Sequence, residues 1–118
     1  MDPLARTRKI CLALPEASER LSHGTPTFFV RAKTVFTMYT EDAYDEPGPA
    51  LWVPAPDGVQ GELIDAEPDR FFRPPYVGHR GWIGVRLDVE PDWGEIGEII
   101  RDGYRKVAPK RLSALLTD

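Results

Sequence analysis

The sequence has one cysteine, Cys11, and no apolar run that approaches the length of a membrane span. A single cysteine excludes both an internal disulfide and a cysteine-based metal cluster. Its neighbours are aliphatic residues of a predicted helix, which favours a small core residue over a nucleophile. The N-terminus MDPLARTRKICLAL also lacks the apolar segment of a signal peptide. We therefore expect a cytoplasmic protein that makes no membrane contact.

Acidic residues are absent from the stretch Phe71–Leu87, although the whole chain has a net charge of -4. The stretch reads FFRPPYVGHRGWIGVRL and carries Arg73, Arg80 and Arg86. Its Pro-Pro pair stiffens the backbone, and its glycines allow sharp bends before a strand begins. Positive charge beside such a specialised backbone is typical of a binding site, but no catalytic motif accompanies it.

The charges of the chain are unevenly distributed. Segments 41–46 and 57–69 contain acids and no base, whereas segment 101–111 is rich in lysine and arginine. The negative net charge argues against strong, non-specific nucleic-acid binding, whose affinity comes from neutralised phosphates. The distribution nevertheless predicts separate acidic and basic surfaces. We expect them on one domain that spans residues 1–118, because a chain of this length builds a single core.

The periodicity of apolar residues predicts a mixed order of helices and strands. Helices are predicted at 3–14, ended by Pro15, at 58–67, capped by Asp57, and at 93–107. Alternating side chains predict an edge strand at 18–22, a hairpin over 27–40 that turns at 31–34, and strands at 50–53 and 82–87. This order predicts an α+β fold, in which an antiparallel sheet of about five strands carries the N- and C-terminal helices on one face.

The helix at 93–107 has an apolar stripe that is expected to pack beneath the sheet. The stripe consists of Trp93, Ile96, Ile100 and Tyr104. Its expected partners are alternate residues of the two hairpin strands, which should lie on one face of the sheet: Phe28, Val30, Phe36 and Met38. Phe71 and Phe72 are also expected to fill the core. The opposite face of the sheet is then at least partly open, and it mixes aromatic with basic residues.

Four segments that together cover nearly the whole chain read SHGTPTFFVRAKTVFTMY, LWV, RFFRPPYVGHRGWIGVRLD and DWGEIGEIIRDGYRKVAPKRL. They resemble the MmcQ/YjbR family of small bacterial proteins. The most specific pieces are Pro75-Tyr76 leading to Gly81-Trp82, and the closing helix with Tyr104. The resemblance implies an α+β fold related to that of the bacterial frataxin homologue, described as a double wing, and a DNA-binding function. The hairpin turn departs from the family, because relatives often have a Gly-Lys turn there.

The first functional hypothesis is therefore a nucleic-acid-binding module with two basic wings, one at the hairpin turn and one before the last strand. Its residues would contact phosphates, while Trp82 stacks or wedges. The candidate DNA-binding residues are Arg31, Lys33, Arg73, His79, Arg80, Trp82 and Arg86. Binding of this kind would be weak and would not depend on the DNA sequence.

The alternative hypothesis is a non-enzymatic binding protein for a small anionic ligand or a protein partner. Its pocket would be formed by His23, Tyr76, His79 and Trp82. Two histidines without a cysteine or carboxylate at ligand spacing make a poor zinc site, and basic residues occupy the first helix where frataxin-like iron binding would need acids. Ser22 and His23 are adjacent in a strand and point to opposite faces, so they form no catalytic dyad. We therefore expect no cofactor, no metal and no enzymatic activity.

Overall fold

The computed structural model describes residues 2–42 and 48–116 of the chain. The elements follow in the order α1 (Pro3–Cys11), β1 (Ala17–Ser22), β2 (Thr25–Val30), β3 (Thr34–Thr40), β4 (Ala50–Val53), α2 (Val59–Ala66), β5 (Phe71–Phe72), the 3-10 helix η1 (Gly78–Arg80), β6 (Ile83–Arg86), α3 (Trp93–Val107) and α4 (Lys110–Ser113). Of the acidic segment 41–46, only Glu41 and Asp42 lie within the described residues. No helix in the described part of the chain is both long and apolar enough to cross a membrane.

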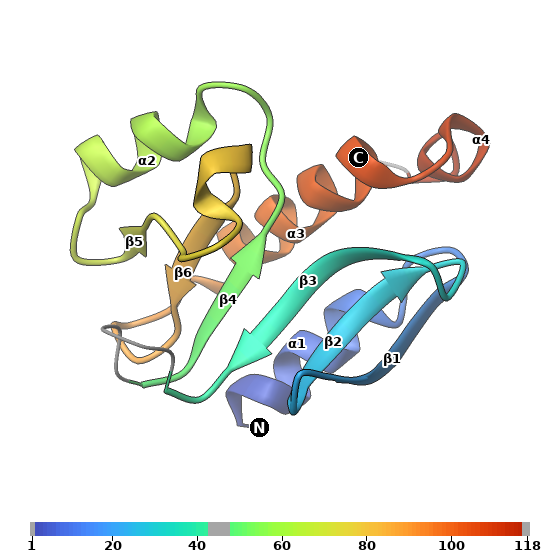
Figure 1. Cartoon of the computed structure of the whole chain (residues 1–118), viewed down its shortest axis with the longest axis horizontal. Coiled ribbons are helices and arrows are strands. Elements are labelled where there is room, and N and C mark those ends of the chain that lie inside the picture. The colour runs from blue at the N-terminus through green and yellow to red at the C-terminus, as the bar shows by residue number, and fades with distance from the viewer. Residues whose placement is uncertain (1, 43–47, 117–118) are drawn as a thin grey trace.

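The sheet has six strands in the order β1-β2-β3-β4-β6-β5, and each neighbouring pair is antiparallel. This confirms the predicted α+β class (Figure 1). The additional strand is β5, which pairs Phe71 with Val85 and Phe72 with Gly84. Two residues are too few for side-chain alternation to be recognised, which explains why about five strands were expected.

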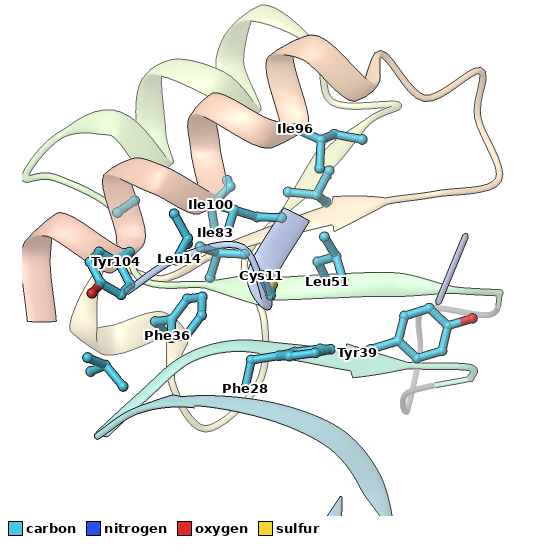
Figure 2. Packing of buried hydrophobic residues seen from close by; sticks show 14 of the residues in the cluster. Cys11, Leu14, Phe28, Phe36, Tyr39, Leu51, Ile83, Ile96, Ile100 and Tyr104 are labelled. Carbon is cyan, nitrogen blue, oxygen red and sulfur yellow. The ribbon is translucent and has the colours of Figure 1, made fainter. Parts of the chain in front are cut away.

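The core lies between the sheet and helices α1 and α3, which cover the same face (Figure 1). On α3, the side chains of Ile96, Ile100 and Tyr104 are completely buried. The sheet residues that surround them in Figure 2 include Phe28, Phe36, Leu51 and Ile83. The Tyr104 ring meets Phe36 edge-on at 5.3 Å between centroids, and its hydroxyl donates to the Pro15 carbonyl at 2.6 Å. The predicted apolar stripe of this helix is thus confirmed.

Met38 does not belong to this core, contrary to expectation. The pairing of β2 with β3 shifts register, with Phe28 opposite Thr37 and Phe29 opposite Val35, so Phe36 is the extra residue of a β-bulge. A one-residue bulge reverses the faces that following residues occupy. Met38 therefore lies on the other face of the sheet, with Trp52 and Trp82.

That other face carries a smaller apolar cluster, made of Ala50, Trp52, Phe72 and Trp82, with Val35, Met38 and Val77 packed against it. The expectation for the Phe pair is therefore only half right. Phe71 is in the main core, while the Phe72 ring covers Gly84 on the opposite face. Gly84 has no side chain to displace this ring, so the aromatic layer lies directly on the strand.

Helix α2 begins differently from the prediction. Its N-cap is Gly58, with φ of 85° and no side-chain hydrogen bond. The Asp57 side chain instead lies 3.5 Å from the Lys106 ammonium on α3. A left-handed backbone at the cap position is readily adopted by glycine, and it directs Asp57 away from the first turn of the helix.

Candidate functional site

A cleft opens where β3 and β4 separate. Within the described residues, the two strands pair from Met38 to Thr40 and no further. Toward the start of β3 they diverge (Figure 1), and Val107 of α3 contributes to the lining there. The cleft has a volume of about 1070 Å³. We call it the sheet cleft, bounded by β3 and the turn 22–27 on one side and by Trp52 and the loop 76–82 on the other.

The loop 76–82 is an ordered part of the cleft wall. The amides of Val77 and Gly78 donate to the carbonyls of Pro75 and Pro74 at 2.7 and 3.0 Å, and a turn of 3-10 helix follows. Gln60 of α2 fixes its far end, because its side-chain amide donates to the Gly78 carbonyl at 2.8 Å and to the Trp82 carbonyl at 2.6 Å. The loop therefore holds its side chains in defined positions.

Two basic side chains line the sheet cleft. Lys33 comes from the turn before β3, and Arg80 comes from the loop before β6, which stands at the end of β4 because Val53 pairs with Ile83. The Arg80 guanidinium lies over the Trp82 ring, 5.7 Å from its centroid. This contact holds a positive charge above the aromatic floor.

The floor contains two buried polar groups without hydrogen-bond partners among the described residues. They are the Trp52 indole Nε1 and the Thr40 Oγ1, and each residue is 5% exposed. Both residues line the sheet cleft. A buried donor or hydroxyl that stays unpaired costs about 1–3 kcal/mol relative to a paired one.

The sheet cleft also has acidic residues, with Glu41 and Asp42 in its lining together with His23. The Tyr39 hydroxyl donates to Glu41 Oε1 at 2.8 Å, and the Gly48 amide donates to Asp42 Oδ1 at 2.8 Å. Burial, and secondarily the hydrogen bond to Glu41, raise the pKa of Tyr39 above its ordinary value. Hydrogen bonds thus partly fix both carboxylates.

The structure brings five of the predicted site residues to the sheet cleft, namely His23, Lys33, Tyr76, Arg80 and Trp82. His79 does not line it and is exposed on η1, so three of the four residues of the predicted ligand pocket lie in the cleft lining. Trp82 is 6% exposed. Its ring is a packed floor rather than a free surface on which a base could stack.

The other predicted DNA-binding residues lie outside the sheet cleft. Arg31 Nε is 3.6 Å from a carboxylate oxygen of Glu16. The Arg86 guanidinium donates to the Pro68 carbonyl at 3.1 Å and lies over the ring of Phe72. The Arg73 side chain runs against Gly78, where an added Cβ would stand 2.5 Å from Arg73 Cγ. None of these three arginines lines the sheet cleft.

Sequence reasoning missed three residues that shape the site. Thr40 and Trp52 look like ordinary strand residues, and only the split between β3 and β4 places them in a cleft. Gln60 lies on a predicted helix, and nothing in the local sequence indicates its two distant carbonyl partners. In the described part of the chain, no group of three or more His, Cys, Asp or Glu residues is arranged to hold a metal ion.

The sequence model of the YjbR family matches residues 12–106, which include both walls of the sheet cleft. The chain belongs to the YjbR family. A similar solved structure is the crystal structure of protein DR2400 from Deinococcus radiodurans, described with the domain DUF419; it has a TM-score of 0.77 and 22% identity, over 94% of this chain and 82% of that one. At this identity the likeness shows the YjbR fold alone. Among curated proteins, none matches this chain.

Proposed function

We propose that this YjbR-family protein is a non-enzymatic, cytoplasmic binding protein that holds a small anionic ligand in the sheet cleft. The observation that carries the proposal is that Lys33 and Arg80 both line a cleft with an apolar floor. Concave sites that combine apolar walls with a few well-placed charges are the usual binding sites of small molecules. The anionic groups of a ligand would pair with these cations.

A binding role is favoured over nucleophilic catalysis by the state of Cys11. This residue is completely buried in the main core, and burial raises the pKa of its thiol to about 12. At neutral pH such a thiol supplies almost no thiolate, which is the nucleophilic form. The strongest nucleophile type in the chain therefore serves packing.

The anion site is tested by isothermal titration with citrate and with inorganic phosphate. We expect the protein to bind at least one of them, and Lys33→Ala combined with Arg80→Ala to weaken that binding by about tenfold or more, because two charge contacts are lost. Arg101→Ala with Lys110→Ala is the control, since it removes the same charge outside the cleft. Equal affinity in both double variants would contradict the proposal.

DNA is a second candidate ligand, because the turn that carries Arg31 and Lys33 stands across the sheet cleft from the loop that carries Arg80. With three or four phosphate contacts, the slope of log affinity against log salt would be about -3, which is a loss of about 60-fold between 50 and 200 mM salt. An electrophoretic shift series on duplex and single-stranded DNA measures this slope. No shift at about 50 mM salt would exclude DNA as the ligand at these contacts.

A further inference from the structure

Tyr76 presents an aromatic ring at the wall of the sheet cleft. The residue lines the cleft and is 70% exposed, whereas Trp52 and Trp82 are packed into the floor at 5% and 6% exposure. A ligand in the cleft therefore has access to the side chain of Tyr76. An aromatic ring left in water forgoes the energy of burial, and a ligand that covers the ring supplies that energy.

The backbone at Tyr76 is strained. Its φ is 66°, in the left-handed region. The Val77 amide donates to the Pro75 carbonyl at 2.7 Å, so Tyr76 is the central residue of a γ-turn. A γ-turn with positive φ is rare, and a bulky residue adopts it at a cost that glycine avoids. Left-handed residues in tight hairpin turns serve to reverse the chain, but Tyr76 lies in the long connection from β5 to β6.

The surrounding structure holds Tyr76 in this conformation. The Gly78 amide donates to the Pro74 carbonyl at 3.0 Å, and the Gln60 side chain donates to the Gly78 carbonyl at 2.8 Å. Backbone strain that is maintained in this way is concentrated at ligand-binding positions. A side chain already held in its bound position loses little freedom when the ligand arrives, which gives the strain at Tyr76 a use.

Arg80 supplies a positive charge from the same loop. The Arg80 amide donates to the Val77 carbonyl at 3.0 Å, which closes a turn. The Cα atoms at the two ends of such a turn are within about 7 Å, so the Cα atoms of Tyr76 and Arg80 are at most about 11 Å apart. Both residues are exposed and line the sheet cleft. One small molecule can therefore contact both side chains.

We infer that the sheet cleft takes a small molecule in which a planar aromatic ring carries an anionic group. The ring stacks on Tyr76, and the anionic group pairs with the Arg80 guanidinium. The inference rests on the proposed function, because it uses the same cleft and one of its cations, and it adds a chemical class for the ligand. The cleft volume of about 1070 Å³ accommodates such a ring, and Val35, Met38 and Val77 provide apolar lining for its edges.

Isothermal titration with 1-naphthyl phosphate, inorganic phosphate and 1-naphthol tests the inference. We expect 1-naphthyl phosphate to bind about tenfold or more tightly than either of the others, because each of these lacks one of the two contacts. Inorganic phosphate that binds as tightly as 1-naphthyl phosphate would overturn the inference and leave the anion site intact. Equal binding of 1-naphthol, or no binding of 1-naphthyl phosphate, would also overturn it, and the citrate and phosphate titrations report separately on the proposed function.

The stacking contact is tested by two substitutions that keep an apolar side chain. Tyr76→Phe retains the ring and should bind 1-naphthyl phosphate within about twofold of the wild type, whereas Tyr76→Leu should lose about fivefold or more. In nuclear magnetic resonance spectra, the naphthyl protons should shift upfield on binding to the wild type and to Tyr76→Phe, because they lie over an aromatic ring. An equal affinity and an equal upfield shift with Tyr76→Leu would show that the ligand does not stack on this residue.

The strain is tested by glycine at two left-handed positions. Tyr76→Gly removes both the ring and the strain, so it should melt no lower than the wild type while losing about tenfold or more in affinity for 1-naphthyl phosphate. Glu90→Gly is the control, because Glu90 also has a left-handed φ, of 36°, and lies outside the cleft lining; its affinity should not change. A Tyr76→Gly protein that melts several degrees lower would show that the ring holds the loop together, and would overturn the assignment of Tyr76 to the ligand.

Discussion

The two faces of the sheet differ in how completely their polar groups are satisfied. On the face covered by α1 and α3, the buried Tyr104 and Thr37 hydroxyls both donate to backbone carbonyls. On the open face, Trp52 and Thr40 are almost as deeply buried, yet their polar atoms have no partner among the described residues. Thr37 and Thr40 stand three residues apart on the same strand.

This difference separates two roles that burial alone does not distinguish. A buried side chain with all its hydrogen bonds made contributes to a unique, stable core. A buried side chain with an unmade hydrogen bond instead lowers the stability of the face that carries it. The covered face thus holds the main core with its buried hydroxyls paired, while the open face holds the cleft that we propose as the binding site.

The largest expected effect is the loss of a core side chain beneath the sheet. Ile100 is completely buried in the main core, so Ile100→Ala should lower the free energy of unfolding by about 2–5 kcal/mol. Val35→Ala on the open face should cost about 1 kcal/mol, because Val35 is only half-buried. Urea denaturation of both variants measures the difference. An equal loss of unfolding free energy at the two positions would show that both faces of the sheet contribute equally to stability.

The next effect concerns the close contact of α3 with the sheet. A Cβ added at Gly103 would stand 2.5 Å from Val53 Cγ1 and 2.8 Å from the Pro54 carbonyl, so Gly103→Ala should destabilise the protein by about 1–3 kcal/mol. Gly97→Ala on the same helix meets only the flexible end of Arg101, at 3.3 Å, and should be neutral or stabilising by up to about 1 kcal/mol. Equal melting temperatures for the two variants would mean that α3 does not depend on this close approach.

The sequence predicts much of this fold because helix and strand periodicity are local properties. The apolar stripe on α3 and the alternation in the hairpin therefore identify the helix and the two strands, and they predict for most residues which side is buried. No residue type in the sequence indicates the bulge at Phe36. Because of this bulge, Met38 lies on the face of the sheet opposite to the predicted one. The strand Phe71–Phe72 is recognisable only through its partner β6.

The candidate site was predicted less completely, for a related reason. The glycine- and proline-rich loop has a visible composition, so Tyr76, Arg80 and Trp82 could be assigned to a site. Thr40 and Trp52 lie in the cleft lining because β3 and β4 separate, which is a tertiary feature. His79 was included because it lies in that loop, but loop membership does not determine the direction of a side chain.

A smaller effect is expected at alkaline pH, and it tests whether water is excluded from the core on the covered face of the sheet. Burial raises the pKa of the Cys11 thiol from 9.0 to about 12, so the neutral thiol is favoured in the folded state. Its stabilising contribution is complete below pH 9 and is lost as the pH rises toward 12. The stability advantage of the wild type over Cys11→Ala should therefore shrink by about 1 kcal/mol between pH 8 and 10. A constant difference across this range would mean that the thiol is hydrated in the folded protein.

The smallest effect on stability is expected at Gln60, whose side chain ties α2 to the loop of the open face. Its amide donates to the Gly78 and Trp82 carbonyls, so Gln60→Ala removes two hydrogen bonds that are partly exposed to water. The free energy of unfolding should fall by only about 1 kcal/mol, since lost bonds are replaced by bonds to solvent. Asp65→Ala, on an exposed position of the same helix, serves as the control.

The effect of Gln60→Ala on binding should be larger than its effect on stability. Without the Gln60 amide, the loop that carries Arg80 samples more conformations, and each bound anion must then order it again. Hydrogen exchange of residues 77–81 should accelerate in Gln60→Ala and remain unchanged in Asp65→Ala. Anion affinity should fall by about fivefold or more in the first variant alone. Unchanged exchange would mean that the proline turn by itself keeps the loop in place, and the open face would then be as rigid as the covered one.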